Sequence, residues 1–211
     1  MEDLKALYDA ILIGDAKTAK STTEKALAAG VTALSLVNDQ MIPAMSEVGQ
    51  RFECNEYFVP ELLLSARAMK AALELIRPLL VASGAQPTGR VAIGTVKGDL
   101  HDIGKNLVAA MLEGGGFEVI DLGVNVTPEQ FIATVREKNA NIIAMSALLT
   151  TTMPSMKTTV EALKKAGVRE QVKVIIGGAP ITQKYADEIG ADGYSDNAVA
   201  AVGVAKKVLA A

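Results

Sequence analysis

The sequence predicts an α/β protein, with an N-terminal bundle of four helices followed by a doubly wound, five-stranded parallel sheet. In the first half, apolar residues recur every three and four positions, which is the spacing of amphipathic helices. In the second half, short β-branched runs alternate with helical stretches, a pattern typical of βα units. Ser83–Gly89 has the composition of a linker and separates the two patterns. We therefore expect a helical domain over residues 1–86 and a sheet domain over residues 87–211.

The four expected helices begin and end at residues with known positional preferences. We expect them over residues 4–12, 15–29, 32–48 and 60–80. Asp15 is a good N-cap for the second helix, and Gly30 suits its C-terminal cap. Pro43 lies inside the third helix and should kink or break it, whereas Pro60 is well placed as a first helical residue. Short loops between these helices favour an antiparallel bundle.

The second half is expected to contain five strands, each followed by a helix. The strands are expected at Val91–Val96, Glu118–Leu122, Ile142–Ser146, Val172–Ile176 and Gly193–Ser195. The helices are expected at Lys105–Glu113, Pro128–Lys138, Ser155–Ala166, Thr182–Ile189 and Asn197–Leu209. We expect the strand order 2-1-3-4-5, a flavodoxin-like or Rossmann-like arrangement with a ligand crevice between strands 1 and 3 at their carboxyl edge.

Composition excludes several classes of function. The formal charge is −3 and no basic run is present, so we expect no nucleic-acid partner. Cys54 is the only cysteine, which rules out a disulfide within the chain and fits a reducing compartment. The start, Met1-Glu2-Asp3, lacks the features of a signal peptide, and no stretch approaches the ~20 apolar residues of a membrane span. The sequence therefore predicts a cytoplasmic protein with no membrane partner.

The run Gly98-Asp99-Leu100-His101-Asp102-Ile103-Gly104 holds the only histidine and follows the first expected strand. A histidine can offer one ring nitrogen to a metal while the other bonds a carboxylate, and Asp99 is close enough in sequence to be that partner. The loops Ser146–Thr152 and Gly177–Pro180 should meet at the same edge and offer hydroxyls and close backbone approach. This pattern indicates a site for a metal or a metallocofactor.

Each of these features also has a purely structural interpretation. A lone histidine is more often a surface or satisfied core residue, Ser146 and Thr150–Thr152 could cap the next helix, and Gly177-Gly178 could be a tight turn. One His and one Cys cannot build a structural zinc site, and Gly94–Gly98 matches neither a dinucleotide fingerprint nor a Walker A loop. No Gly-x-Ser-x-Gly elbow is present, and nothing identifies Ser146 as a nucleophile in a triad with His101 and Asp99.

The run Gly94-Thr-Val-Lys-Gly-Asp-Leu-His-Asp-Ile-Gly-Lys-Asn106 resembles the signature of cobalamin-binding domains. The similarity is to the methyltransferase branch, which includes methionine synthase and the corrinoid proteins of methanol, methylamine and methoxyaromatic systems. The likeness covers nearly the whole chain. Further matches are Asp121-Leu-Gly-Val, Ser146-Ala-Leu-Leu-Thr, Ile176-Gly-Gly-Ala, Phe58-Val-Pro-Glu-Leu and Ser65-Ala-Arg-Ala-Met-Lys.

The resemblance implies a role for each residue of the histidine loop. His101 would be the lower axial ligand of cobalt in place of the corrinoid's own base, the base-off/His-on form. Asp99 would bond the other imidazole nitrogen, and Thr152, where methionine synthase has serine, would complete a relay. Ser146, Thr150, Gly177 and Gly178 would line the channel for the nucleotide tail, with Ala198 near its far end, and Phe58 would cover the methyl face. The remaining residues implied at the cofactor are Gly98, Leu100, Asp102, Gly104 and Leu148.

The function that the resemblance implies is a corrinoid methyl carrier whose cobalt cycles between Co(I) and methyl-Co(III). A substrate-specific methyltransferase would supply the methyl group, and a second methyltransferase would pass it to tetrahydrofolate or coenzyme M, with a reductive activator as a further partner. The chain would not turn over alone. The alternatives are a cobalamin-dependent sensor, the cobalamin subunit of a mutase, or a flavodoxin-like protein without a corrin. The methyl donor, the acceptor, the lower base and a homodimer through the helical half are left open.

Overall fold

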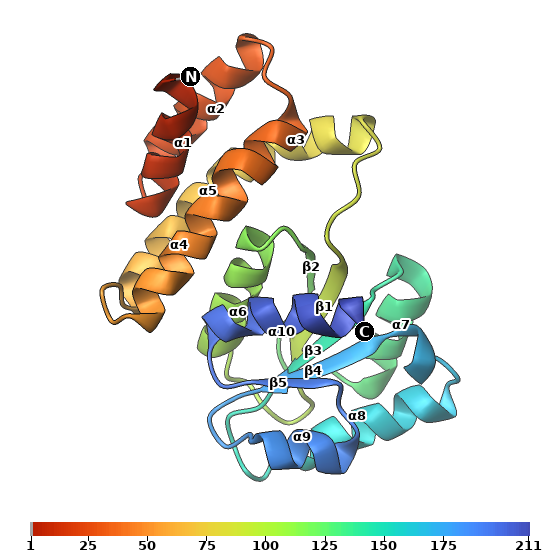
Figure 1. The fold of residues 1–211 in the computed structure, drawn as a ribbon. Helices are drawn as coiled ribbons and strands as arrows, with labels where there is room; N and C mark the ends of the chain where they lie inside the picture. The colour runs from red at the N-terminus through yellow and green to blue at the C-terminus, as the bar shows by residue number, and fades with distance from the viewer. Residues whose placement is uncertain (1) are drawn as a thin grey trace. The chain divides into compact units, whose positions relative to one another are not determined.

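The computed structural model describes residues 2–211, with side chains from Lys5 onward; Met1 and the side chain of Leu4 in the expected first stripe lie outside it. Contacts divide the described chain into two compact units (Figure 1). One contains the residues up to Pro87 together with Glu113–Gly116, and the other contains Thr88–Leu112 and Phe117–Ala211. Among the described residues, no helix is both long enough and apolar enough to cross a membrane. The cytoplasmic location stays a prediction.

The first unit is the expected helical bundle. Its helices are α1 (Glu2–Leu12), α2 (Ala16–Ala28), α3 (Ala33–Leu36), α4 (Ile42–Glu53) and α5 (Val59–Ala82). Leu7, Ile11 and Met69 are almost fully buried in its core, as their helical spacing predicted. The Asp15 carboxylate accepts a hydrogen bond from the Thr18 amide and caps α2, which confirms the predicted N-cap.

The third expected helix differs from the prediction in two ways. Between α3 and α4 the helix continues through a π-helical turn, Val37–Met41, in which the Ile42 amide bonds to the Val37 carbonyl. Pro43 cannot donate a backbone hydrogen bond, and a widened turn just before it is one way a helix accommodates that loss. The expected end at Val48 is also wrong, because α4 continues to Glu53. Arg51 pairs with Glu47 at 2.6 Å across one helical turn, so polar contacts sustain the helix beyond its apolar stripe.

The second unit contains the expected sheet. Within residues 2–211, five parallel strands form one sheet in the order β2-β1-β3-β4-β5, as predicted. The strands are β1 (Arg90–Thr95), β2 (Glu118–Asp121), β3 (Ile142–Ser146), β4 (Lys173–Gly177) and β5 (Gly193–Ser195). The helices are α6 (Ile103–Gly114), α7 (Pro128–Lys138), α8 (Pro154–Lys165), α9 (Gln183–Ile189) and α10 (Ala198–Ala210). Their ends differ from the predicted ones by at most two residues, and a 3₁₀ turn at Arg169–Gln171 was not expected.

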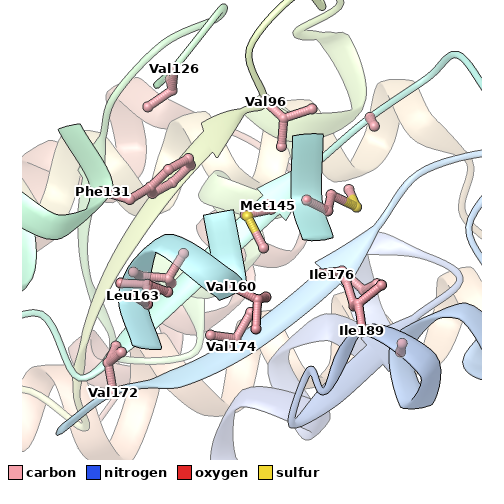
Figure 2. Packing of buried hydrophobic residues seen from close by; sticks show 14 of the residues in the cluster. Val96, Val126, Phe131, Met145, Val160, Leu163, Val172, Val174, Ile176 and Ile189 are labelled. Atoms are coloured by element: carbon pink, nitrogen blue, oxygen red, sulfur yellow. The ribbon is translucent and has the colours of Figure 1, made fainter. Parts of the chain in front are cut away.

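Helices cover both faces of this sheet, so β3 and β4 alternate between two apolar cores. Ile143 and Met145 of β3 pack in the cluster that includes side chains of α7, α8 and α9 (Figure 2). Ile142 and Ala144, on the opposite face, pack in the cluster that includes side chains of α6 and α10. A parallel sheet buried on both faces explains why its strands are continuous apolar runs in the sequence.

Strand register aligns small and polar residues at the carboxyl edge of the α6/α10 face. The pairings Thr95↔Ser146, Ser146↔Gly177 and Gly177↔Ser195 form one row across four strands. Two residues further into the sheet, Ile93, Ala144, Ile175 and Gly193 form the parallel apolar row. Side chains on one face of a strand recur every second residue. On this face they therefore change from small and polar at the carboxyl edge to apolar two residues further into the sheet.

We predict that Gly14→Ala destabilises the helical unit more than Gly30→Ala does. Both glycines have positive φ (77° and 85°), so each alanine incurs the left-handed penalty of about 1–2 kcal/mol. Only at Gly14 would the new Cβ meet another group, the Leu64 Cβ of α5 at 2.5 Å, whereas Gly30 has no neighbour within 4 Å. The expected excess cost is about 1–3 kcal/mol for overpacking.

Thermal or urea unfolding of the two variants beside the wild type measures this difference. Equal losses at the two positions would contradict the close packing of the α1–α2 turn against α5.

Candidate functional site

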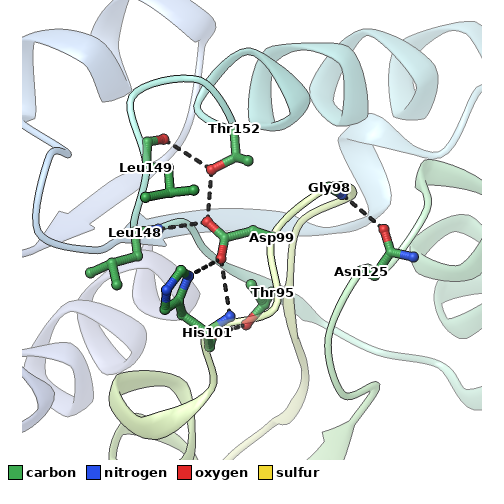
Figure 3. Close-up of polar contacts among 8 residues, drawn as sticks. All are labelled: Thr95, Gly98, Asp99, His101, Asn125, Leu148, Leu149 and Thr152. Atoms are coloured by element: carbon green, nitrogen blue, oxygen red, sulfur yellow. Dashed lines mark hydrogen bonds and ion pairs between the residues drawn. The ribbon is translucent and has the colours of Figure 1, made fainter.

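Asp99 is a buried carboxylate at the carboxyl edge of the sheet, in the loop between β1 and α6. Its side chain is fully shielded from solvent. Oδ1 accepts hydrogen bonds from the His101 amide (3.1 Å) and faces His101 Nδ1 at 2.7 Å. Oδ2 accepts from the Leu148 amide (2.8 Å) and the Thr152 hydroxyl (2.7 Å) (Figure 3). Every lone-pair direction of the carboxylate is thus used, as an ionised acid in a protein interior requires.

Two opposing effects act on the pKa of Asp99. Burial alone raises the pKa, because a low-dielectric interior disfavours the charged form. The hydrogen bonds from the Thr152 hydroxyl and the Leu148 and His101 amides, with the His101 ring, outweigh that effect. They hold the pKa of Asp99 well below its usual range, so the group is a carboxylate at neutral pH.

The ionised Asp99 determines the tautomer of His101. A carboxylate only accepts hydrogen bonds, so Nδ1 carries a proton, and in the neutral form of the ring the lone pair lies on Nε2. No hydrogen bond involves Nε2 in the part of the chain that the structure describes, and the His101 side chain is 52% exposed. Apolar side chains around this loop are also exposed, namely Leu100, Ile103, Leu148 and Leu149. The arrangement presents one imidazole lone pair at an apolar surface.

Thr152 contacts Asp99, as the resemblance implied. Its hydroxyl lies 2.7 Å from Asp99 Oδ2 and 2.9 Å from the Leu149 carbonyl, and the residue is buried. The alternative, that this hydroxyl caps the following helix, is wrong: the N-cap of α8 is Met153, which makes no side-chain cap bond. The chain Thr152–Asp99–His101 is therefore continuous (Figure 3), and its role as a relay stays a prediction.

A pocket of about 310 Å³ lies on the α6/α10 face at the same edge of the sheet. Four of the residues expected to line a nucleotide channel line this pocket, namely Ser146, Gly177, Gly178 and Ala198. Gly178 passes so close to the Ala147 carbonyl that no Cβ would fit, which explains the glycine at this turn. Leu148 and Thr150 lie outside the lining, where Leu148 contributes its amide to Asp99 and Thr150 is exposed.

The other predicted residues lie in the histidine loop, along the pocket or in the helical unit. Gly98 forms the turn before Asp99, with φ 87°, and Gly104 lines the pocket from the first turn of α6. The Asp102 carboxylate accepts a hydrogen bond from the Asn106 amide group one turn along α6. Phe58 belongs to the helical unit, where it is 60% exposed at the start of α5. Its place over a cofactor stays a prediction.

Sequence reasoning missed three residues around this loop. The buried Thr95 hydroxyl donates to the His101 carbonyl at 2.7 Å, and the Asn125 side chain accepts from the Gly98 amide at 2.8 Å. The buried Lys105 ammonium pairs with Asp121 at 2.5 Å, joining the start of α6 to the end of β2. The signal for Lys105 was available, since a lysine on the inner stripe of a helix needs a carboxylate partner. The other two contacts depend on loop conformations that the sequence pattern does not encode.

We predict that Thr152→Val lowers the free energy of unfolding of the protein without bound ligand by about 1.5–3 kcal/mol, because a buried charge loses a hydrogen bond. Valine keeps the shape of threonine and removes only the hydroxyl. Thr152→Ser keeps the donor and should cost clearly less. Urea unfolding of the three proteins measures the difference, and a valine variant as stable as the serine variant would show that the hydroxyl does not stabilise Asp99.

Both units of the chain resemble known protein families. A B12 binding domain model matches residues 89–203, and a second B12 binding domain model matches residues 3–77. Trimethylamine corrinoid protein 1 of Methanosarcina acetivorans is 43% identical over 203 residues, 95% of this chain and 94% of that protein.

Two solved structures share the fold over nearly all of the chain. A cobalamin-binding protein from Desulfitobacterium hafniense is 35% identical, with a TM-score of 0.79 over 97% of this chain and 98% of that one. The methanol:cobalamin methyltransferase complex MtaBC from Methanosarcina barkeri contains a chain that is 29% identical, with a TM-score of 0.87 over 99% of this chain and 80% of that one. With its sheet unit matched by one B12 binding domain model and its helical unit by another, this chain belongs to the family of B12-binding corrinoid proteins.

Proposed function

We propose that this chain is a corrinoid methyl carrier that presents a bound methyl group to partner methyltransferases in turn. The observation that supports this most strongly is the imidazole of His101, held through Nδ1 by a buried carboxylate and open at Nε2. An imidazole held in this way through Nδ1 can bind a metal through Nε2 with its supporting hydrogen bond already formed. Corrinoid relatives with the same two-part organisation support the same conclusion.

The residues present fit a corrinoid better than a bare metal ion. Among the described residues, no group of three or more His, Cys, Asp or Glu side chains could hold an ion. His101 alone offers a single ligand, so the other ligands have to come from a cofactor that brings its own. The exposed apolar side chains of Leu100, Ile103 and Leu148 beside the imidazole suit the face of a macrocycle and would exclude water from it.

The pocket at the same edge of the sheet suits the nucleotide tail of such a cofactor. Its lining begins with Ser146, Gly177 and Ser195 at the sheet edge and continues to the apolar Ala144 and Ile175. A polar edge above an apolar interior matches a ligand with a phosphate and sugar at one end and an aromatic base at the other. Because the tail would occupy this pocket, its base would be away from cobalt, which leaves the lower position to His101.

The corrinoid, when bound, supplies the cobalt ion that accepts and releases the methyl group. The protein's own residues orient it: Asp99 keeps the His101 proton on Nδ1, and Thr152 and the Leu148 amide keep Asp99 ionised. In this proposal the groups that act on the methyl donor and on the methyl acceptor belong to partner enzymes. The complex of a similar chain with a methanol methyltransferase supports such a partner for this chain. The acceptor enzyme, the reductive activator and the Phe58 contact belong to the same proposal.

We expect the wild-type protein to retain hydroxocobalamin in a one-to-one ratio after desalting. His101→Ala should retain it with an altered visible spectrum, because the lower cobalt ligand changes from imidazole to water. An unchanged spectrum in the variant would show that His101 is not the ligand, and a colourless wild type would contradict corrinoid binding.

The carrier function is tested with the same loaded, reduced protein. It should become methylated when mixed with a methylamine- or methanol-specific methyltransferase and its substrate, and lose the methyl group to a second methyltransferase. Selective retention of adenosylcobalamin with no methylation by any partner would instead favour the mutase or sensor alternatives.

We also predict that Ala201→Leu weakens corrinoid binding by about tenfold or more. Ala201 is buried on α10 and lines the pocket, so a larger side chain would occupy space needed by the nucleotide tail. Gly203→Leu, at an exposed position of the same helix with no neighbour within 4 Å, is the matched control. Equilibrium binding followed by absorbance measures both, and equal affinity for the two variants would contradict the assignment of the pocket.

A further inference from the structure

Asn125, in the loop between β2 and α7, contacts the histidine loop with both its side chain and its backbone. Its Oδ1 accepts a hydrogen bond from the Gly98 amide at 2.8 Å (Figure 3). Its own amide donates to the Asp99 carbonyl at 3.0 Å. Asn125 therefore binds the backbone of two consecutive residues, Gly98 and Asp99, and it does so without contacting the His101 ring.

The loop that carries Asn125 is itself anchored to the sheet. The Val126 amide donates to the Thr95 carbonyl at 2.9 Å, and Val96 and Val126 form a parallel bridge beyond the end of β1. Asn125 adopts a left-handed conformation, with φ 53°. Asparagine is one of the few side-chain-bearing residues that enter this region readily, and such a conformation persists only when surrounding contacts hold it.

The histidine loop is thus fixed on two sides. On one side, the Asp99 carboxylate binds the loop after β3 through the Leu148 amide and the Thr152 hydroxyl. On the other side, Asn125 holds Gly98 and Asp99, and the Thr95 hydroxyl holds the His101 carbonyl. Without the second set, the carboxylate could keep its hydrogen bond to the ring while the backbone beneath both residues shifted.

We propose that Asn125 is a positioning residue for the axial ligand, and that it sets how firmly His101 coordinates cobalt by fixing the backbone from Gly98 to His101. This inference rests on the proposed function, because it needs His101 to be the ligand. Coordination demands that a ligand be held within about 0.5 Å of its productive position, so a backbone anchor affects ligation even though it lies outside the relay.

Two variants separate the side chain of Asn125 from its backbone conformation. Asn125→Gly keeps the left-handed φ and removes the acceptor of the Gly98 amide, whereas Asn125→Asp keeps an acceptor oxygen. Asn139→Gly is the matched control, since Asn139 also has positive φ (52°) but caps the far end of α7 and is exposed.

Each protein is loaded with hydroxocobalamin. The cyanide concentration that displaces half of the imidazole is read from the visible spectrum. A second sample is reduced to cobalt(II) with a chemical reductant, and a change in the nitrogen splitting of its EPR signal on labelling the protein's histidine with 15N identifies the imidazole as ligand. We expect Asn125→Gly to lower that cyanide concentration about fivefold, the effect of one lost hydrogen bond, and Asn125→Asp to recover most of it. Asn139→Gly should match the wild type.

The other possible outcomes separate the role of Asn125 from the proposed axial ligand. Wild-type nitrogen splitting with an unchanged cyanide titration in Asn125→Gly overturns the role of Asn125 and leaves the methyl carrier intact. An equal loss in Asn139→Gly also overturns it, because the effect would then reflect general destabilisation. A wild type that binds cobalamin without nitrogen splitting from histidine, or does not bind it, overturns the proposed axial ligand and this inference together.

Discussion

The structure of this site depends on the burial of one charge, the carboxylate of Asp99. An ionised group in a protein interior is tolerated only when its lone pairs are satisfied, and the four donors around Asp99 come from two separate loops. The requirement therefore ties the loop after β1 to the loop after β3. It also sets the tautomer of His101. Asp99 can only accept hydrogen bonds, so the ring nitrogen that faces it, Nδ1, carries the proton.

The sheet makes this meeting of loops possible. Parallel strands end at one edge, and the β2-β1-β3-β4-β5 order brings the ends of β1 and β3 together, although Asp99 and Thr152 are 53 residues apart in the chain. The same register places Ser146, Gly177 and Ser195 in one row at the edge of the pocket. The proposed cofactor ligation and nucleotide-tail binding would thus both follow from one strand arrangement.

In the proposed function, the chain binds and orients the cofactor, and partner enzymes carry out the methyl transfer. One imidazole supplies a single metal ligand and cannot hold an ion by itself. The exposed side chains around it are apolar and do not form an active site by themselves. Both features are understandable in a carrier, whose reactive centre has to be accessible to more than one enzyme. Hydrogen bonds run from Thr152 through Asp99 to His101, and Asn125 and Thr95 hold the backbone of the same loop. Together they fix the position of the His101 ring, which would be the same with every partner.

The sequence by itself indicated the helical bundle, the alternating strands and helices and the histidine loop, because periodicity and a specific motif are local properties. The strand order was expected from the arrangement that such alternating units favour, and the tertiary structure confirmed it. The sequence also predicted the Thr152 partner by resemblance. Tertiary structure decided the π-turn and the longer end of α4, and that the Thr152 hydroxyl serves Asp99 and not the helix that follows it. It alone revealed Asn125, because that contact joins loops of different strands through a left-handed backbone. Local patterns cannot encode such a contact, which exists only once the sheet has brought the loops together.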